Sequence, residues 1–338
     1  MNQSTWIKGA LVGVPAGMML IGVVSLLFFS SAPDAPVAQV DRVSGFLRAP
    51  VNEAALRRWV QRLSVDIAAR PGSDVTKSRI TAKWIESELS EDNMGYRPEV
   101  RIFEVDGLQY RNVEAQLPGT TRPGEIVVVG AHYDSVADCP GANDNGTGVA
   151  AMLAIAQAFT GTENVRTLRF VAFANEEPPF FRTDAMGSLV YAMGCRQRGE
   201  EIFGMISLES LGYYTDEENS QKFPPGLRKF YPDTGNFVGI VGDENSKALV
   251  ELFYRSFRSV SDFPVQKAAL PPELPGIGWS DHWSFWQCGY PALMVTDTAT
   301  YRYPHYHKPS DTPDKVDFTR YTLVVKGLAG AVKALVNP

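Results

Sequence analysis

Apolar residues recur at helical spacing in the first half of this chain after residue 51. Residues 52–68 and 73–92 both show this spacing, and a Pro-Gly-Ser start signal precedes the second segment. Residues 97–105 and 110–117 have the composition and alternation of a strand pair. This part of the chain therefore predicts two helices followed by two paired strands.

Further along, short β-branched and aromatic runs alternate with helical stretches. The predicted strands are 125–135, 167–177, 203–213 and 291–299, and the predicted helices include 146–159, 187–199 and 317–336. Strands that are apolar on both faces and alternate with helices indicate a mostly parallel sheet that is covered on both sides. We therefore expect an α/β catalytic domain over residues 52–338 with a mostly parallel central sheet.

The N-terminus has a different pattern, because no charged residue lies between Lys8 and Asp34 and residues 9–29 are almost entirely apolar. About 20 helical residues span a ~30 Å hydrocarbon core. We expect residues 1–31 to be an uncleaved transmembrane anchor and 32–51 a proline-spaced tether. The catalytic domain would then lie outside the cytoplasm. The alternative is a cleaved signal peptide and a secreted protein.

Composition limits the possible partners. With 32 basic and 38 acidic residues the net charge is −6, and no basic block is present that would bind a phosphate backbone, so we expect no nucleic-acid partner. The three cysteines, Cys139, Cys195 and Cys288, form no closely spaced metal motif. They allow one disulfide with one thiol left over, or three buried reduced thiols.

Potential metal ligands follow the predicted strands, at the edge of a parallel sheet where ligands bind. These residues are His132, Asp134, Asp144, Glu176, Glu177, Glu209, His305 and His307. Each one alone has an ordinary explanation, such as a hydrogen-bonded histidine or a carboxylate that caps a helix. Their joint placement after successive strands instead indicates a metal site.

These residue types suit zinc, and one carboxylate can bridge two ions. Two ions ~3.5–4 Å apart can share a hydroxide and polarise a carbonyl. Asp144 suits the bridge, because the glycines around it let the backbone approach the metal closely. Of the adjacent Glu176 and Glu177, one would bind metal and the other would accept a proton from the attacking water.

Six motifs in order carry a resemblance to a known family. They are GAHYDS, PGANDNGTG, FANEE, SLESLGY, SDHWSFWQCGYPALMV and HKPSDTPDKVD, spread over residues 130–317. They resemble the co-catalytic dizinc aminopeptidases, a family that also holds glutamate carboxypeptidases and is related to glutaminyl cyclases. The resemblance implies two zinc ions per chain and peptide substrates.

The resemblance also implies a role for each matching residue. His132 would bind one zinc, Asp144 would bridge both, Glu177 would be a further ligand and Glu176 the general base. Asp134 would orient His132 as a carboxylate behind a histidine ligand. His307 matches the His-x-x-x-Asp-Thr element of the family, with Asp311 and Thr312 after it, which would leave His305 close to the metal without binding it.

One ligand position departs from the family pattern. The aminopeptidases usually carry aspartate where this chain has Glu209, which is one methylene longer but offers the same oxygens, so a second zinc is feasible. Three tyrosines, Tyr301, Tyr303 and Tyr306, are candidates to hydrogen-bond an oxyanion.

Two further segments are candidates to lie beside the site. The element Ser280, Asp281 and His282 is expected near the site without binding metal. The loop 176–188 is either an ordinary surface loop or a wall of the substrate pocket.

Three hypotheses for function follow. The first is a zinc exopeptidase, most simply an aminopeptidase that hydrolyses the N-terminal residue of peptides. The second is another activity of the related enzymes, either a glutaminyl cyclase-like acyltransferase or a glutamate-type carboxypeptidase. The third is a catalytically silent binding ectodomain, which the filled ligand positions disfavour.

Overall fold

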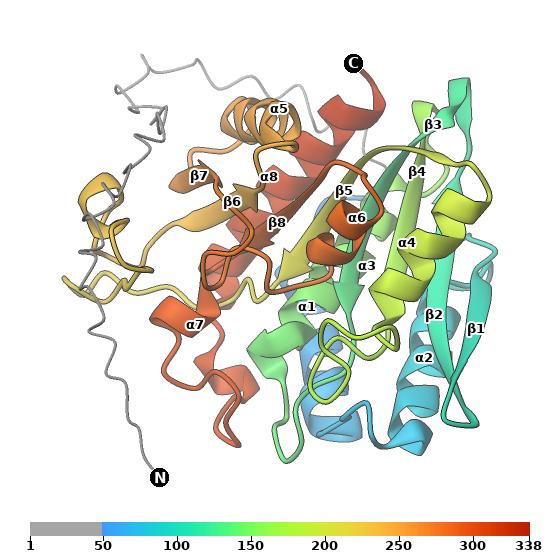
Figure 1. The fold of residues 1–338 in the computed structure, drawn as a ribbon, viewed down its shortest axis with the longest axis horizontal. Helices are drawn as coiled ribbons and strands as arrows, with labels where there is room; N and C mark the ends of the chain where they lie inside the picture. The colour runs from blue at the N-terminus through green and yellow to red at the C-terminus, as the bar shows by residue number, and fades with distance from the viewer. Residues whose placement is uncertain (1–48) are drawn as a thin grey trace, which may run out of the picture. The chain divides into compact units, whose positions relative to one another are not determined.

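A single sheet organises residues 49–338, the part of the chain that the computed structural model describes. Its eight strands follow the order β1-β2-β4-β3-β5-β8-β6-β7 (Figure 1). The strands are β1 (Glu99–Val105), β2 (Leu108–Leu117), β3 (Gly119–His132), β4 (Asn164–Phe173), β5 (Glu201–Glu209), β6 (Val238–Gly242), β7 (Val265–Ala269) and β8 (Ala292–Thr296). The helices are α1 (Glu53–Gln61), α2 (Val75–Leu89), α3 (Gly148–Phe159), α4 (Gly187–Gln197), α5 (Lys247–Arg258), α6 (His282–Gln287), α7 (Ala299–Arg302) and α8 (Phe318–Val336).

The direction of the strands confirms the α/β class and refines the predicted sheet. The central strands β4, β3, β5 and β8 are parallel to one another. Strands β1 and β2 pair, as predicted, and run antiparallel, and β2 joins β4 antiparallel. At the other edge β6 is antiparallel to β8 and parallel to β7. The sheet is therefore parallel at its centre and mixed as a whole.

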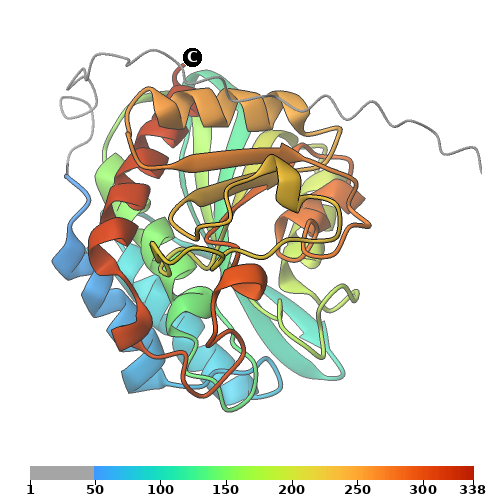
Figure 2. The same ribbon diagram turned by 90° about the vertical axis from the view of Figure 1, so that its left-hand side faces the viewer.

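Both faces of the central strands are buried, which explains why these strands are mostly apolar in their carboxyl-terminal halves. Along β3, Val127 and Val129 belong to one hydrophobic cluster, and Val128 belongs to another on the opposite face. The first cluster packs under α1, α2, α3, α5 and α8, and the second packs under α4 and α6. Figure 2 shows α5 near β6 and β7 and alongside α8. Because the strands are buried on both faces, the polar residues at their carboxyl ends stand out in the sequence.

The predicted helices are present, with capping groups at several of their starts. Asn52 and Asp74 accept hydrogen bonds from the first backbone N–H groups of α1 and α2, and Asp317 does the same for α8. The segment predicted as one helix over 52–68 consists of α1 and a π-helical turn, Arg62–Ile67.

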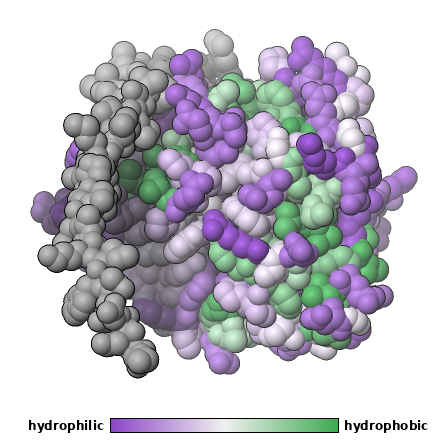
Figure 3. All heavy atoms as spheres, viewed as in Figure 1, coloured by the Kyte–Doolittle hydropathy of each residue, from purple (hydrophilic) through white to green (hydrophobic). Residues whose placement is uncertain are grey.

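All three cysteines are buried and unpaired, so the structure agrees with the alternative in which no disulfide forms. Within residues 49–338 no helix is long and apolar enough to cross a membrane. The predicted anchor, residues 1–31, lies outside the described residues, as does most of the tether. On the face shown in Figure 3, hydrophilic residues surround smaller hydrophobic areas.

Candidate active site

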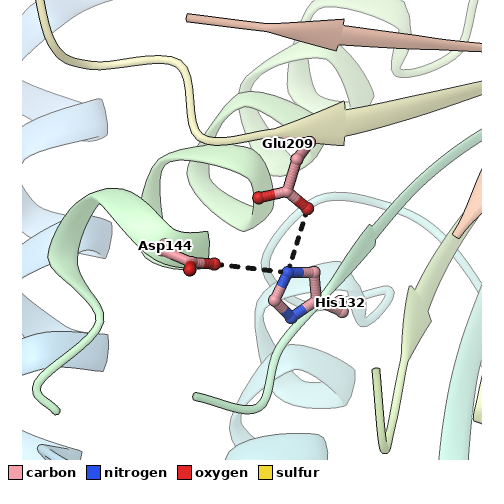
Figure 4. Close-up of side chains that lie close together, drawn as sticks. All are labelled: His132, Asp144 and Glu209. Atoms are coloured by element: carbon pink, nitrogen blue, oxygen red, sulfur yellow. Dashed lines mark hydrogen bonds and ion pairs between the residues drawn. The ribbon is translucent and has the colours of Figure 1, made fainter. Parts of the chain in front are cut away.

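The carboxyl ends of the central strands bring together side chains that are far apart in the sequence. His132 is the last residue of β3, Glu209 the last of β5, and Glu176 follows β4 after a short turn. His132 Nε2 lies 3.1 Å from Glu209 Oε2 and 3.5 Å from Asp144 Oδ1. Figure 4 shows these three side chains pointing toward one another. All three are buried.

A second group of ligand atoms shares Asp144 with the first. His307 Nε2 lies 3.1 Å from Asp144 Oδ2 and 3.2 Å from Glu177 Oε2. Asp144 thus directs one carboxylate oxygen to each histidine, as a bridging ligand must. Within each of these two groups, His132–Asp144–Glu209 and Asp144–Glu177–His307, the donor atoms lie within 4.8 Å of one another, and the same holds for a third group, His132–Glu176–Glu177.

The residues of these groups are chemically suited to bind a divalent metal ion. Buried carboxylates crowd around two imidazole nitrogens, and one oxygen of Glu177 is buried without a hydrogen-bond partner. Burial raises the pKa of Glu177 to about 7, with a further contribution from Asp144. Burial alone would lower the pKa of His132, but the nearby Glu176 and Glu209 more than offset this effect, so the pKa is raised. Bound zinc would displace the protons of these groups, since side chains bind metal in their deprotonated form.

The loop that carries Asp144 is fixed to β5 by a neighbouring side chain. Asn145 Nδ2 donates to the carbonyl oxygen of Leu208 at 2.8 Å, and its Oδ1 accepts from the backbone N–H of Ser210 at 3.0 Å. At Gly148 an added Cβ would lie only 2.3 Å from the Leu208 carbonyl oxygen, so this close approach requires glycine. These contacts hold Asp144 beside Glu209.

Two buried charged residues hold the same loop from other sides. Asp311 accepts hydrogen bonds from the backbone N–H groups of Asn143 at 2.9 Å and Asp144 at 3.1 Å. Arg70, which is fully buried, donates to the carbonyl oxygens of Pro140 at 2.6 Å and Gly141 at 2.9 Å. Sequence reasoning did not identify Arg70 as a site residue, because one arginine before a Pro-Gly-Ser turn carries no pattern.

Asp134 serves the metal cluster and the glutamate pair together. One of its carboxylate oxygens lies 3.5 Å from His132 Nδ1, a buried nitrogen that makes no hydrogen bond. Its two oxygens also accept the backbone N–H groups of Glu176 and Glu177, each at 3.0 Å. Asp134 therefore sets the backbone position from which both glutamate side chains enter the site.

The two glutamates then separate. Glu177 Oε2 faces His307, whereas Glu176 Oε2 lies 3.8 Å from His132 Nε2, farther than the other carboxylates of that group. Burial raises the pKa of Glu176 well above its ordinary value, although His132 opposes the shift. A carboxylate with this property that is not needed as a ligand suits a proton acceptor.

Of the remaining candidate residues, some contact the candidate ligands and others do not. His305 bonds Ser310 Oγ through Nδ1 at 2.8 Å and belongs to none of the candidate metal groups found in residues 49–338. Ser280 Oγ donates to Glu209 Oε2 at 2.8 Å, and both carboxylate oxygens of Asp281 are buried without a partner. His282 hydrogen-bonds the backbone of Ile277 instead of the metal cluster. Of the SDH element, Ser280 is the residue that hydrogen-bonds a candidate ligand.

Comparison with known proteins agrees with this geometry. The family model for peptidase family M28 matches residues 112–332. The chain belongs to peptidase family M28. The family inferred from the six motifs is thereby confirmed, and the peptidase class is confirmed with it.

Among the relatives of this chain, YfbL of Escherichia coli K12, an uncharacterized protein, is 33% identical over 282 residues, which cover 81% of this chain and 85% of YfbL. A probable leucine aminopeptidase of Arthroderma otae is 26% identical over 254 residues, or 70% of this chain. The match spans 61% of the length of that fungal protein.

Solved structures show the same fold. The zinc aminopeptidase BSAP of Bacillus subtilis superposes with a TM-score of 0.69 at 15% identity, covering 85% of this chain and 96% of BSAP. A glutaminyl cyclase of Fimbriiglobus ruber superposes with a TM-score of 0.59 at 21% identity, covering 85% of this chain and 96% of the cyclase. The fold is therefore shared by enzymes of both classes, and the choice between them rests on the site.

Proposed function

We propose that this M28 protein is a zinc-dependent aminopeptidase that holds two metal ions. His132, Asp144 and Glu209 would bind one ion, and Asp144, Glu177 and His307 the other. The single observation that carries the proposal is the position of Asp144, whose two carboxylate oxygens face different histidines. When bound, zinc would act as a Lewis acid on the scissile carbonyl and lower the pKa of water.

Glu176 is the proton acceptor in this proposal. Its buried carboxyl group has a raised pKa, so it can take a proton from the attacking water and return it to the leaving amine. Asp134 keeps Glu176 in place through the backbone and orients His132 through its Nδ1. This division of roles uses a water nucleophile, which hydrolysis requires and the cyclase reaction does not.

Of the three tyrosines, Tyr306 is best placed to hydrogen-bond the developing oxyanion. Tyr301 donates its hydroxyl to the carbonyl oxygen of Pro275, and Tyr303 donates to Asp311. No hydrogen bond in residues 49–338 engages the Tyr306 hydroxyl, and its ring stacks on His307 with centroids 3.9 Å apart. Burial raises the pKa of Tyr306, so the phenol stays protonated and can donate.

An apolar cavity next to the candidate metal ligands supports a preference for substrates whose N-terminal residue has a large hydrophobic side chain. The cavity has a volume of about 110 Å³, about ten times what one water needs on the same measure. Its wall includes Glu209 and Tyr306. The apolar lining includes Leu227, Tyr231, Leu270, Ile277, Trp279, Met294 and Tyr301. The loop 176–188 contributes no residue to this wall, so it does not enclose the cavity as one sequence-based interpretation expected.

Localisation follows only from the sequence. We propose that residues 1–31 anchor the protein in a membrane with the catalytic domain on the outer side. Recovery of the protein in the soluble fraction, with a mature start near residue 32, would contradict the anchor without affecting the proposed chemistry.

The experiment is a substrate comparison on the purified, zinc-loaded full-length protein. We expect hydrolysis of leucine and phenylalanine amides and of peptides with a free hydrophobic N-terminus, and loss of activity on chelation with recovery on adding zinc. N-terminally acetylated peptides should resist. Cyclisation of N-terminal glutamine, or release of C-terminal glutamate from blocked peptides, would favour the alternative activities. Metal analysis should find two ions per chain, and one would contradict the bridging role of Asp144.

A further inference from the structure

Arg182 is an arginine near the active site with no acidic partner. It lies in the segment that follows Glu176 and Glu177, and it adopts a left-handed backbone conformation with φ of 56°. Its Nη2 donates to the carbonyl oxygen of Gly278 at 2.8 Å. No ion pair within residues 49–338 includes Arg182. Its guanidinium is therefore fixed through one nitrogen while its charge is unpaired.

The guanidinium of Arg182 contacts the chain next to the apolar cavity that would hold the substrate side chain. Gly278 lies between Ile277 and Trp279, which both line the apolar cavity. Contact at Gly278 is close, because an added Cβ would lie 2.6 Å from Arg182 Nη2. The segment carrying Arg182 lies at the same end of the sheet as the loop after β3 (Figure 1). Arg182 thus connects the segment that follows the proton acceptor to the chain between two residues of the cavity wall, and we call this region the rim of the cavity.

The surroundings keep the guanidinium oriented without neutralising it. Its central carbon lies 5.2 Å from the ring centroid of Trp283 and 5.4 Å from that of Phe181. Burial lowers the pKa of Arg182 more than the charge of Glu176 raises it. A planar cation next to two aromatic rings is a good receptor for a carboxylate, which it binds more strongly than a neutral group.

A peptide bound as proposed above would bring its own carboxylate toward this rim. If the N-terminal side chain fills the cavity and the scissile bond lies beside Glu176, the rest of the peptide must leave past the segment that follows Glu176. In a dipeptide or tripeptide the C-terminal carboxylate comes only one or two residues after that bond. Longer peptides carry it well beyond the rim.

We propose that Arg182 binds the C-terminal carboxylate of short peptides, which makes dipeptides and tripeptides the preferred substrate class. This inference rests on the proposed aminopeptidase function. Arg182 would be a specificity residue that adds a charge-assisted hydrogen bond for a free carboxylate and nothing for its amide. The preference should therefore depend on peptide length and on the charge at the C-terminus.

The test compares matched peptides that differ only at the C-terminus. Leu-Ala, Leu-Ala-Ala and Leu-Ala-Ala-Ala-Ala-Ala are assayed with a free carboxylate and as amides on the zinc-loaded full-length protein. We expect kcat/KM to favour the free acid by about 10-fold or more for the di- or tripeptide, the size typical of a hydrogen bond to a charged group. The hexapeptide should show no preference.

Variants assign the preference to one side chain. Arg182→Gln should abolish it by lowering kcat/KM for the short acids, with the amides unchanged within about twofold, and Arg182→Lys should keep part of it. Arg196→Gln is the matched control, because Arg196 also donates to a backbone carbonyl, that of Cys288 at 3.0 Å, but from α4. Arg196→Gln should leave every ratio unchanged. Thermal unfolding checks that each variant is folded.

Two outcomes would overturn the inference. One is an absence of any acid-over-amide preference at all three lengths, and the other is an equal loss on acids and amides in Arg182→Gln. Calorimetric binding of Leu-Ala and its amide separates this inference from the proposed function. Tighter binding of the acid that depends on Arg182, without hydrolysis of either, would refute the aminopeptidase function alone. Equal binding of acid and amide would refute the proposed role of Arg182 as the residue that binds the carboxylate.

Discussion

Replacing Asp311 should destabilise the loop that presents Asp144, by an amount that follows from the hydrogen bonds it accepts. Three donors point at this carboxylate: the backbone N–H groups of Asn143 and Asp144, and the hydroxyl of Tyr303 at 2.8 Å. Asp311 is fully buried, so water does not replace it. A buried donor left without an acceptor costs about 1–3 kcal/mol.

The size of the effect should depend on the substitution. Asp311→Ala leaves all three donors unsatisfied, so we expect the free energy of unfolding to fall by about 3–9 kcal/mol. In Asp311→Asn the amide oxygen can still accept from Asn143 and Tyr303, while the amide nitrogen opposes the N–H of Asp144. That variant should lose about 1–3 kcal/mol. The order of stability is therefore wild type, then the asparagine variant, then the alanine variant.

Urea unfolding of the metal-free protein measures this effect without a contribution from zinc binding. Burial raises the pKa of Asp311 to about 6, so measurements at pH 8 keep the carboxylate ionised. Zinc affinity, determined with a competing chelator, should fall in the same order. Asp314→Ala is the control, because Asp314 is exposed and accepts only from residues of its own turn and from Lys315. It should behave as wild type. An unchanged urea midpoint in Asp311→Ala would refute the reasoning.

Other predictions concern the ligands and one buried histidine. Glu176→Gln should retain zinc while kcat and kcat/KM fall together by roughly 10²-fold or more, whereas Glu177→Gln should also lose metal; zinc content and steady-state rates decide, and the reverse pattern would exchange the two roles. His307→Ala should lose zinc and activity and His305→Ala should keep both, so metal loss only in the latter would show that the wrong histidine was chosen. Burial lowers the pKa of His282 to about 4, and unfolded imidazole titrates near 6.5, so the stability that its neutral ring contributes above pH 6.5 is lost as pH falls toward 4. In metal-free His282→Gln the fall in unfolding free energy over this range should be smaller by about 3 kcal/mol, and an unchanged slope would contradict the assignment.

The centre of the sheet and most of the site could be predicted because both depend on local pattern. A strand buried on two faces is apolar along its length, so β3, β4 and β5 are recognisable and their first polar residues mark the edge where ligands gather. His132 and Glu209 were found in this way. The structure adds that Asp144 faces both histidines, which depends on distances across the sheet.

The edge of the sheet and the substrate cavity could not be predicted in the same way. Strands β6 and β7 have five residues each, and β6 contains two glycines. Their place beside β8 depends on long connections that carry no periodic signal. The cavity wall comes from these same segments, and the choice among three tyrosines depends on which hydroxyls are already engaged. Such features arise from tertiary packing.

The hydrogen bonds from Arg70 to the loop of Asp144 indicate how much of the chain an independent catalytic unit needs. The match to the family begins at residue 112, and a fragment cut there would keep every candidate ligand. It would lack the guanidinium that engages the carbonyl groups of Pro140 and Gly141, and these groups would stay buried without that donor. Fragments for expression, or grafts of this site onto another scaffold, should therefore begin before α1.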